Sequence, residues 1–383
     1  MESLKGKVAI VGVGDTECGR PTGKSSLRLA AESARNAIED AGLTKEDIDG
    51  VLTSTPISEP HHMFSHFFIE YMGIRTKYNC ATGVGGATPH GNVMQAAALI
   101  AAGICNVVLI ADGDRRATQF RGDKAIALGS HFELVEEFET PFGPFAAGTY
   151  AWIAQRHMYE YGTTSEQLAA ITVAARKHGA LHPNSTLRSP VTVQDVLNSP
   201  MVASPLHLLD CCLVSDSAGA IIVTSAERAG DLRKPPVYVL GMGQANQGYH
   251  LTQAPSLTSF PIKESGQRAF QMAELEPKYI DVAAIYDSFT ITALVAIEDL
   301  GFCQKGEGGP FVQGGHIELG GQLPLNTHGG QLSHNGGHSH FIIEAVRQLR
   351  SEAGDRQVKN ARLALSQGTA GVGSASFTLI LGK

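Results

Sequence analysis

A tyrosine, an aspartate and a serine follow one another at the end of an apolar segment, as Tyr286-Asp287-Ser288 within residues 284–290. A phenol can act as a general base when a nearby imidazolium or oriented donors bring its pKa well below the ordinary value of about 10. Four histidines follow further along the chain: His328, His334, His338 and His340. A phenol and imidazoles together suit proton transfer.

The histidines also raise the possibility of a metal site. His334 and His338 are spaced so that a helix would present both on one face, as in zinc sites. However, Gly336 and Gly337 lie between them and disfavour a helix, and no glutamate lies there as the HExxH motif requires. We therefore expect no metal. A catalytic role for one histidine and structural roles for the others both remain open.

Thiols are the other reactive groups, and they are scattered: Cys18, Cys80, Cys105, Cys211, Cys212 and Cys303. No CxxC pair occurs, so neither a zinc ribbon nor a disulfide framework is expected within this chain. This usage of cysteine fits a reducing cytoplasm.

Composition excludes several classes of function. The net charge is −7 and no run of Lys and Arg is longer than a pair such as Arg115-Arg116, so nucleic acid is not an expected partner. No apolar run reaches the roughly 18–20 residues that cross a bilayer. The first residues lack a hydrophobic signal core. A cytoplasmic protein is expected.

Two similar successions of strands and helices must position these side chains. In the first half, strands are predicted at 8–13, 50–55, 106–112 and 218–225, with helices at 26–42 and 93–102. In the second half, strands are predicted at 237–242, 281–286, 361–366 and 376–381, with helices at 267–273, 290–300 and 338–350. The recurrence predicts an internal duplication.

Residues 113–215 interrupt the first half with aromatic, His, Pro and Arg residues and a helix around 165–178. We therefore predict an N-terminal half at 1–230 that contains an inserted loop domain at 113–215, and a C-terminal half at 236–383. The expected fold class is α/β, with a duplicated five-layer α/β/α/β/α arrangement.

Several phrases in this order resemble the thiolase superfamily, above all the sterol-carrier-protein-type thiolases and their lipid-transfer-protein relatives. These phrases occupy residues 98–111, 215–220, 300–309, 325–332 and 344–350. The resemblance spans essentially the whole chain. It implies the thiolase-like five-layer fold, a homodimer formed across the first-half sheet, and a small separately encoded companion with a zinc ribbon and an OB-fold.

Thiolases use a cysteine at the N-terminus of a buried helix, where the helix dipole favours the thiolate that takes the acyl group. In this chain the corresponding position falls at Gly86, which carries no thiol. Cys80, in Asn-Cys-Ala-Thr-Gly at 79–83, imitates the thiolase cysteine motif but lies too far upstream. Either an insertion follows Cys80 or the imitation is accidental.

The acid/base motifs depart as well. Sterol-carrier-type thiolases carry HDCF where this chain has Tyr286 and Ser288 in place of the His and the Cys. An ungapped comparison puts Gly336 at the His of their GHP motif, with His334 and His338 two residues to either side. Residues 366–369, Ser-Gln-Gly-Thr, stand where degradative thiolases have CxG.

Steroid side-chain-cleaving aldolases of the lipid-transfer-protein type carry YDCFT in the frame of residues 286–290, and they lack the nucleophilic cysteine. The resemblance therefore implies retro-aldol cleavage of a β-hydroxyacyl-CoA, with Tyr286 as the base and His334 or His338 as a further catalytic group. Asn326, Gly330 and Gly373 are the candidates for holding the thioester oxygen.

Two alternatives remain at this point: an acyl-CoA acyltransferase that uses Cys80, and a non-catalytic scaffold subunit. No cofactor is expected beyond the coenzyme A that the substrate carries. Steroid, aromatic and aliphatic acyl chains are all compatible with the sequence.

Overall fold

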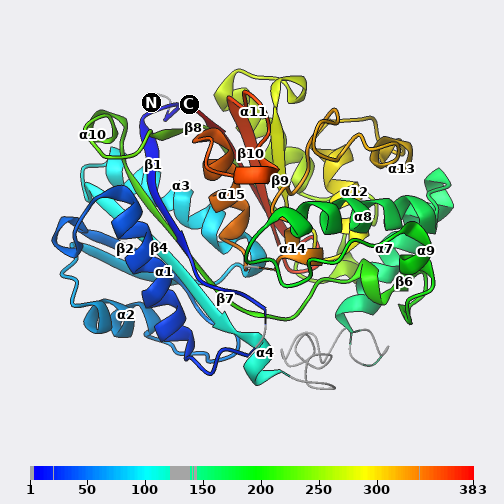
Figure 1. Cartoon of the computed structure of the whole chain (residues 1–383), viewed down its shortest axis with the longest axis horizontal. Coiled ribbons are helices and arrows are strands. Elements are labelled where there is room, and N and C mark those ends of the chain that lie inside the picture. The colour runs from blue at the N-terminus through cyan, green and yellow to red at the C-terminus, as the bar shows by residue number, and fades with distance from the viewer. Residues whose placement is uncertain (1–3, 20, 121–138, 140, 142–144, 336) are drawn as a thin grey trace.

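The computed structural model describes residues 4–19, 21–120, 139, 141, 145–335 and 337–383 (Figure 1). The principal strands are β1 (Val8–Asp15), β2 (Gly50–Ser54), β3 (Tyr78–Thr82), β4 (Val107–Arg115), β7 (Asp216–Ser225), β8 (Val237–Asn246), β9 (Val282–Ile285), β10 (Leu363–Ala370) and β11 (Ala375–Gly382). They hydrogen-bond in the order β3-β2-β4-β7-β1-β8-β11-β10-β9, and β5 (Met201–Ala203) pairs separately with β6 (Leu206–His207).

The helices cover this sheet and fill the space between its halves. The longer ones are α1 (Ser26–Ala41), α2 (Phe64–Met72), α3 (Thr88–Ala101), α7 (Ala146–Tyr161), α8 (Ser165–Leu181), α11 (Ile262–Ala273), α12 (Thr290–Asp299) and α15 (His340–Leu349). The short ones are α4 (Arg116–Gln119), α9 (Val193–Leu197), α10 (Ala226–Ala229), α13 (Gly308–Val312) and α14 (Gly330–Ser333).

The two halves of the sheet repeat one topology. In the first, β2 runs parallel to β4, β4 antiparallel to β7, and β7 antiparallel to β1. In the second, β9 runs parallel to β10, β10 antiparallel to β11, and β11 antiparallel to β8. A short antiparallel ladder between β1 and β8 joins the halves. The duplicated plan expected from the sequence is confirmed, whereas the exact boundaries of the halves and of the loop domain remain predictions.

Five layers result. Helix α1 packs on β1, β4 and β7, and α11 packs in the equivalent way on β8 and β11. Helices α3 and α15 contact strands of both halves, which makes them the shared middle layer (Figure 1). One hydrophobic cluster of this layer takes buried side chains from both halves, among them Val93, Ile110, Ile342 and Leu379. Helices α3 and α15 of this middle layer therefore bring residues of the first and second halves of the chain close together.

Among the strands of the main sheet and the longer helices, β3, α2 and α7 were not anticipated. Strand β3 is short and lies at the sheet edge, where its pairing with β2 rather than any periodic pattern defines it.

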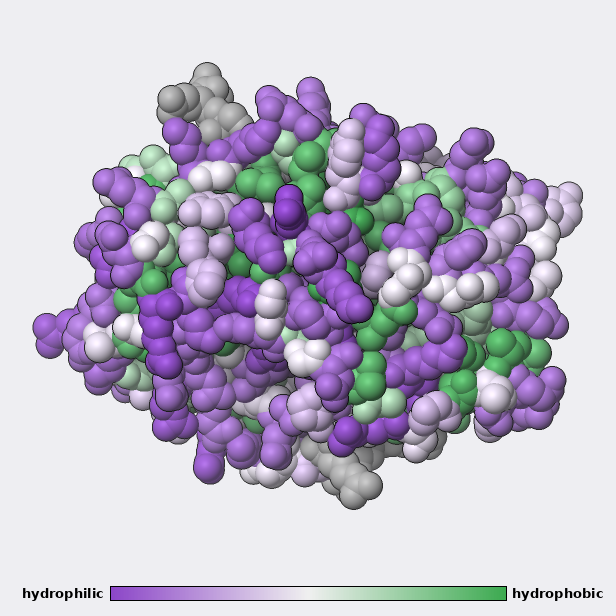
Figure 2. All heavy atoms as spheres, turned by 45° about the horizontal axis from the view of Figure 1, so that its top comes forward, coloured by the Kyte–Doolittle hydropathy of each residue, from purple (hydrophilic) through white to green (hydrophobic). Residues whose placement is uncertain are grey.

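Within the described residues, no helix is long and apolar enough to cross a bilayer. Figure 2 accordingly shows polar side chains over most of the face in view, with apolar groups in separate small patches.

Candidate active site

Tyr286 lies directly after β9, at the edge of the second half-sheet that faces helix α3. Its backbone N–H donates to the Gln367 carbonyl oxygen at 3.1 Å. Just before it, the Asn326 side chain accepts a hydrogen bond from the Ile285 N–H and donates one to the Ile285 carbonyl oxygen, each of 2.8 Å. Because both amide atoms of Asn326 are used in this way, the side chain holds the strand end in position.

The ring of Tyr286 packs directly on Gly86, two residues before α3. A Cβ atom at position 86 would lie 2.7 Å from the ring Cζ and 2.6 Å from the Thr369 carbonyl oxygen. Real Cβ atoms do not approach so closely, because such contacts are strongly repulsive. No side chain, thiol or other, therefore fits at position 86 while Tyr286 occupies this place.

Cys80 is located differently. It lies in the middle of β3 rather than at a helix N-terminus, and its half-buried side chain packs on the cluster of the middle layer. Its sulfur approaches the Ala81 carbonyl oxygen at 3.6 Å. The helix-dipole activation that a nucleophilic cysteine uses is absent at this position.

His338 is the histidine that faces Tyr286, with ring centroids 5.7 Å apart. Two donor nitrogens flank its ring: Arg116 Nη2 lies 3.4 Å from His338 Nε2, and Gln331 Nε2 lies 3.1 Å from His338 Nδ1, and a neutral imidazole can accept from one of them. Burial, reinforced by the charge of Arg116, lowers the pKa of His338 to about 3. The imidazole is therefore neutral at physiological pH.

His334 points elsewhere, into a cluster of buried imidazoles that also contains His182, His328 and His340. Its ring lies 4.3 Å from His182, 4.9 Å from His340 and 5.6 Å from His328. Within the described residues, no three His, Cys, Asp or Glu side chains are placed to hold a metal ion. Gly336, the position aligned with the GHP histidine, lies outside the described residues. The structure thus brings His338, and not His334, to Tyr286.

This cluster predicts acid-sensitive stability. Burial lowers the pKa values of His182 and His328 to about 3, that of His340 to about 4, and that of His334 well below 6.5. Between these values and the unfolded pKa of about 6.5, the unfolded chain binds more protons than the folded one. Stability is therefore full above pH 6.5 and falls as the pH drops toward 4, by up to ~1.4 kcal/mol per pH unit for each histidine.

Urea unfolding at pH 7.5, 6 and 5 measures this slope. His334→Gln should flatten it, whereas His62→Gln, at an exposed position, should leave it unchanged. Equal slopes for the two variants would contradict the assignment.

Three side chains near Tyr286 were not singled out by the sequence motifs: Arg116, Tyr150 and Cys212. The Tyr150 hydroxyl donates to the Gly371 carbonyl oxygen at 3.0 Å, and its ring stacks on Phe289 at 4.3 Å. Burial raises the pKa of Tyr150 to about 12 and that of the Cys212 thiol to about 11. Both groups are therefore neutral. No signal in the sequence singles them out, since Arg115-Arg116 is one of several adjacent basic pairs.

The protonation state of Tyr286 follows from these neighbours. Burial raises the pKa of its phenol above the ordinary value, Tyr150 and Cys212 act in the same direction, and the positive charge of Arg116 opposes them. This corrects the expectation of a lowered pKa due to an imidazolium, because His338 is neutral. The resting side chain is a protonated phenol.

Two glycines named from the sequence border the same region. Gly330 has φ 58°, and a Cβ there would overlap the Asp287 carboxyl group, which is buried. Asp287 Oδ1 accepts from the Gln331 N–H at 2.7 Å, and burial raises the pKa of this carboxyl to about 8. Gly373 has φ 71° and lies against the Phe260 ring. Both positions require glycine for reasons of space and backbone conformation.

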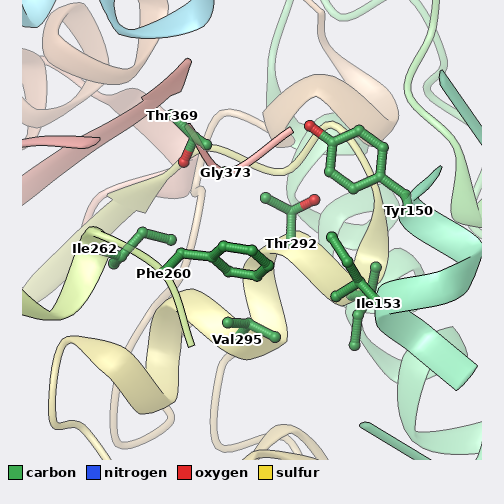
Figure 3. A pocket seen from close by; sticks show the side chains of 9 residues that line it. Tyr150, Ile153, Phe260, Ile262, Thr292, Val295, Thr369 and Gly373 are labelled. Carbon is green, nitrogen blue, oxygen red and sulfur yellow. The ribbon is translucent and has the colours of Figure 1, made fainter. Parts of the chain in front are cut away.

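A small apolar cavity adjoins Tyr150 and Gly373. Figure 3 shows Tyr150 and Ile153 from α7 on one side, Thr292 and Val295 from α12 below, and Phe260 between them and Thr369. Its volume of about 10 Å³ admits about one water molecule. An acyl chain does not fit there without rearrangement.

Comparison with known proteins places this geometry in context. The sequence profile of the thiolase C-terminal domain-like family matches residues 243–383. The chain is 37% identical to the steroid side-chain-cleaving aldolase of Thermomonospora curvata, over 100% of this chain and 99% of that protein. It is 36% identical to the 17-hydroxy-3-oxo-4-pregnene-20-carboxyl-CoA lyase of Mycobacterium tuberculosis, over 99% of this chain and 100% of that protein.

Relatives with another activity are also similar. An acetyl-CoA acetyltransferase of Methanothermobacter thermautotrophicus is 33% identical over 98% of this chain and 99% of its own. Among solved structures, the Ltp2-ChsH2(DUF35) aldolase superposes with a TM-score of 0.89 at 36% identity, covering 100% of this chain and 99% of that one.

Proposed function

The chain belongs to the thiolase superfamily, in the branch of sterol-carrier-protein-type thiolases and steroid side-chain-cleaving aldolases, and we propose that it is a carbon–carbon lyase acting on a β-hydroxyacyl-CoA. One observation carries this proposal: the ring of Tyr286 fills the space above Gly86, where a thiolase keeps its nucleophilic cysteine. A reaction without an acyl-enzyme is the chemistry that such a site retains.

The proposed reaction is a retro-aldol cleavage in which Tyr286 carries one proton between two positions of the substrate. The resting phenol first loses its proton to solvent. The phenolate then takes the proton of the β-hydroxyl group, the bond between the α- and β-carbons breaks, and a ketone or aldehyde forms. The electron pair of that bond passes to the thioester, which becomes an enolate. The phenol then returns the proton to the α-carbon, which yields a shorter acyl-CoA and regenerates the phenolate.

The other site residues have supporting roles in this proposal. His338 is neutral, and Arg116 and Gln331 at its two ring nitrogens hold the imidazole against Tyr286. Asn326 positions the end of β9 through its bonds to Ile285. Backbone N–H groups near Gly330 and Gly373 are our candidates for stabilising the enolate oxygen. His334 has a structural role within the histidine cluster.

An acyltransferase that uses Cys80 is the second candidate, since one similar protein is an acetyl-CoA acetyltransferase. The position of Cys80 in the edge strand β3 speaks against it. A non-catalytic scaffold would not need a tyrosine so closely fitted to Gly86.

We further propose a homodimer. Strand β3 is paired only on its β2 side within the described chain, and the adjacent helix α2 exposes Phe67 and Tyr71. An unpaired edge beside apolar side chains favours association. A small companion subunit is a second proposal, supported by the solved complex of a similar chain with a DUF35 protein. A cytoplasmic location agrees with six unpaired cysteines.

The proposed function predicts a specific pair of products. Incubation with a panel of β-hydroxyacyl-CoA thioesters bearing steroid, aromatic and aliphatic chains should release a ketone or aldehyde and a shorter acyl-CoA in equal amounts. Chromatography of both products, with and without a co-expressed DUF35 protein, measures this. Acyl transfer to free coenzyme A from a β-ketoacyl-CoA, without cleavage of any β-hydroxyacyl-CoA, would refute the lyase and favour the acyltransferase.

A further inference from the structure

Arg116 occupies a particular place at the site. It is the first residue of α4, directly after β4, and its half-buried guanidinium is anchored by the Asp114 carboxylate, with Nε donating to Oδ2 at 2.8 Å. A second nitrogen, Nη2, donates to Nε2 of His338 at 3.4 Å. The His338 ring in turn lies against the Tyr286 ring. Two partners thus hold the guanidinium, and one of them, His338, lies against the Tyr286 ring.

The reaction requires positive charge at this place. A phenolate in a low-dielectric site is costly unless a cation faces it. The other groups that act on Tyr286 do not supply one: Tyr150 and Cys212 are neutral hydroxyl and thiol groups that become negative when ionised, and Asp287 can only become negative. His338 is neutral, because burial, reinforced by the charge of Arg116, holds its pKa well below the ordinary value. Arg116 remains charged throughout.

We propose that Arg116 is the counter-ion of the Tyr286 phenolate, a positioning residue that makes the base of the lyase reaction available and keeps His338 neutral. This inference rests on the proposed function. The guanidinium acts through its charge on the phenol and through its contact with Nε2 of His338, whose Nδ1 faces the Gln331 side-chain amide. Its charge opposes the burial that raises the pKa of the phenol, so it lowers the free energy of the phenolate on which the proposed reaction depends.

The neighbouring arginine offers a matched control. Arg115 has the same side chain and a similar degree of exposure, but its guanidinium pairs with Glu59 at 3.3 Å. Arg116→Ala is expected to lower kcat by about 10²–10³-fold, the usual cost of removing one preorganised electrostatic group. KM should change little, since the group acts on the base. Arg115→Ala should retain nearly all of the kcat.

Three readouts separate this role from a merely structural one. In Arg116→Ala, the rise of kcat/KM with pH should move to higher pH, because a phenol without its cation ionises later. Guanidinium chloride at concentrations below those that unfold the protein should restore part of the lost kcat, whereas sodium chloride at equal ionic strength should not. Arg116→Lys should retain more activity than Arg116→Gln, since lysine keeps the charge.

Definite outcomes would overturn the inference. If the wild-type protein cleaves β-hydroxyacyl-CoA but Arg116→Ala keeps the wild-type pH profile, or is not rescued by guanidinium while its urea midpoint is unchanged, Arg116 is not the counter-ion. If the variant is unstable, the Arg116→Lys and Arg116→Gln pair decides: equal activity of the two refutes the charge requirement. Absence of cleavage by the wild-type protein would instead refute the proposed function itself.

Discussion

Tyr286→Phe is expected to reduce kcat for cleavage of a β-hydroxyacyl-CoA by about 10²–10⁴-fold, the range that one positioned proton-transfer group contributes. The variant removes a single oxygen. The ring atoms that pack on Gly86 and face His338 remain. The loss should therefore fall on kcat, with KM for the thioester and the urea midpoint close to their wild-type values. Product formation followed by chromatography and a denaturation curve measure both.

Cys80→Ser is the matched test of the competing chemistry. The thiol lies in β3, so the lyase proposal expects full activity from this variant. A Cys80→Ser protein without activity, together with an active Tyr286→Phe protein, would reverse the assignment and establish an acyltransferase. If neither substitution changed the activity of the native complex, the chain would be a scaffold.

Gly86→Ala also carries a large expected effect, although it leaves every reactive atom in the protein. The added methyl group would meet the Tyr286 ring and the Thr369 carbonyl oxygen at distances that force one of them to move. The carbonyl belongs to β10, so the ring at the strand end is the part that yields more readily. A displacement of about 1 Å at a catalytic group can cost about 10²-fold in rate. We expect that loss in kcat.

Stability should fall at the same time by about 1–3 kcal/mol, as overpacking in a filled interior usually costs. Gly83→Ala is the control, three residues earlier in the same segment, where an added Cβ meets no atom within 4 Å. It should leave both quantities unchanged. If Gly86→Ala had wild-type kcat, the close fit between Tyr286 and Gly86 would not be needed for the reaction.

The proximity of Gly86 and Tyr286 explains how far the sequence alone could lead. The sequence alone shows each departure from the thiolase motifs: position 86 has no thiol, and position 286 has a tyrosine where a histidine is expected. Their physical relation was not visible, because 200 residues separate them and no local periodicity couples them. In the structure, the ring of one residue occupies the side-chain space of the other.

The strand and helix plan was determined by the sequence, because hydrophobic periodicity depends on neighbours along the chain. The repeated order of strands around β9 and β10 follows from it and is confirmed. Strand β3 was missed because edge pairing with β2, not periodicity, creates it.

The identity of the histidine beside Tyr286 was decided only by the tertiary structure. His334 and His338 each lie two residues from Gly336 in sequence, yet the first lies in the histidine cluster and the second faces Tyr286. The protonation state of the tyrosine was likewise inaccessible. It depends on burial and on Arg116, which β4 delivers from 170 residues away. Long-range packing sets the distances between Tyr286 and its charged neighbours and the dielectric environment of the phenol. Neither can be read from the residues adjacent in sequence.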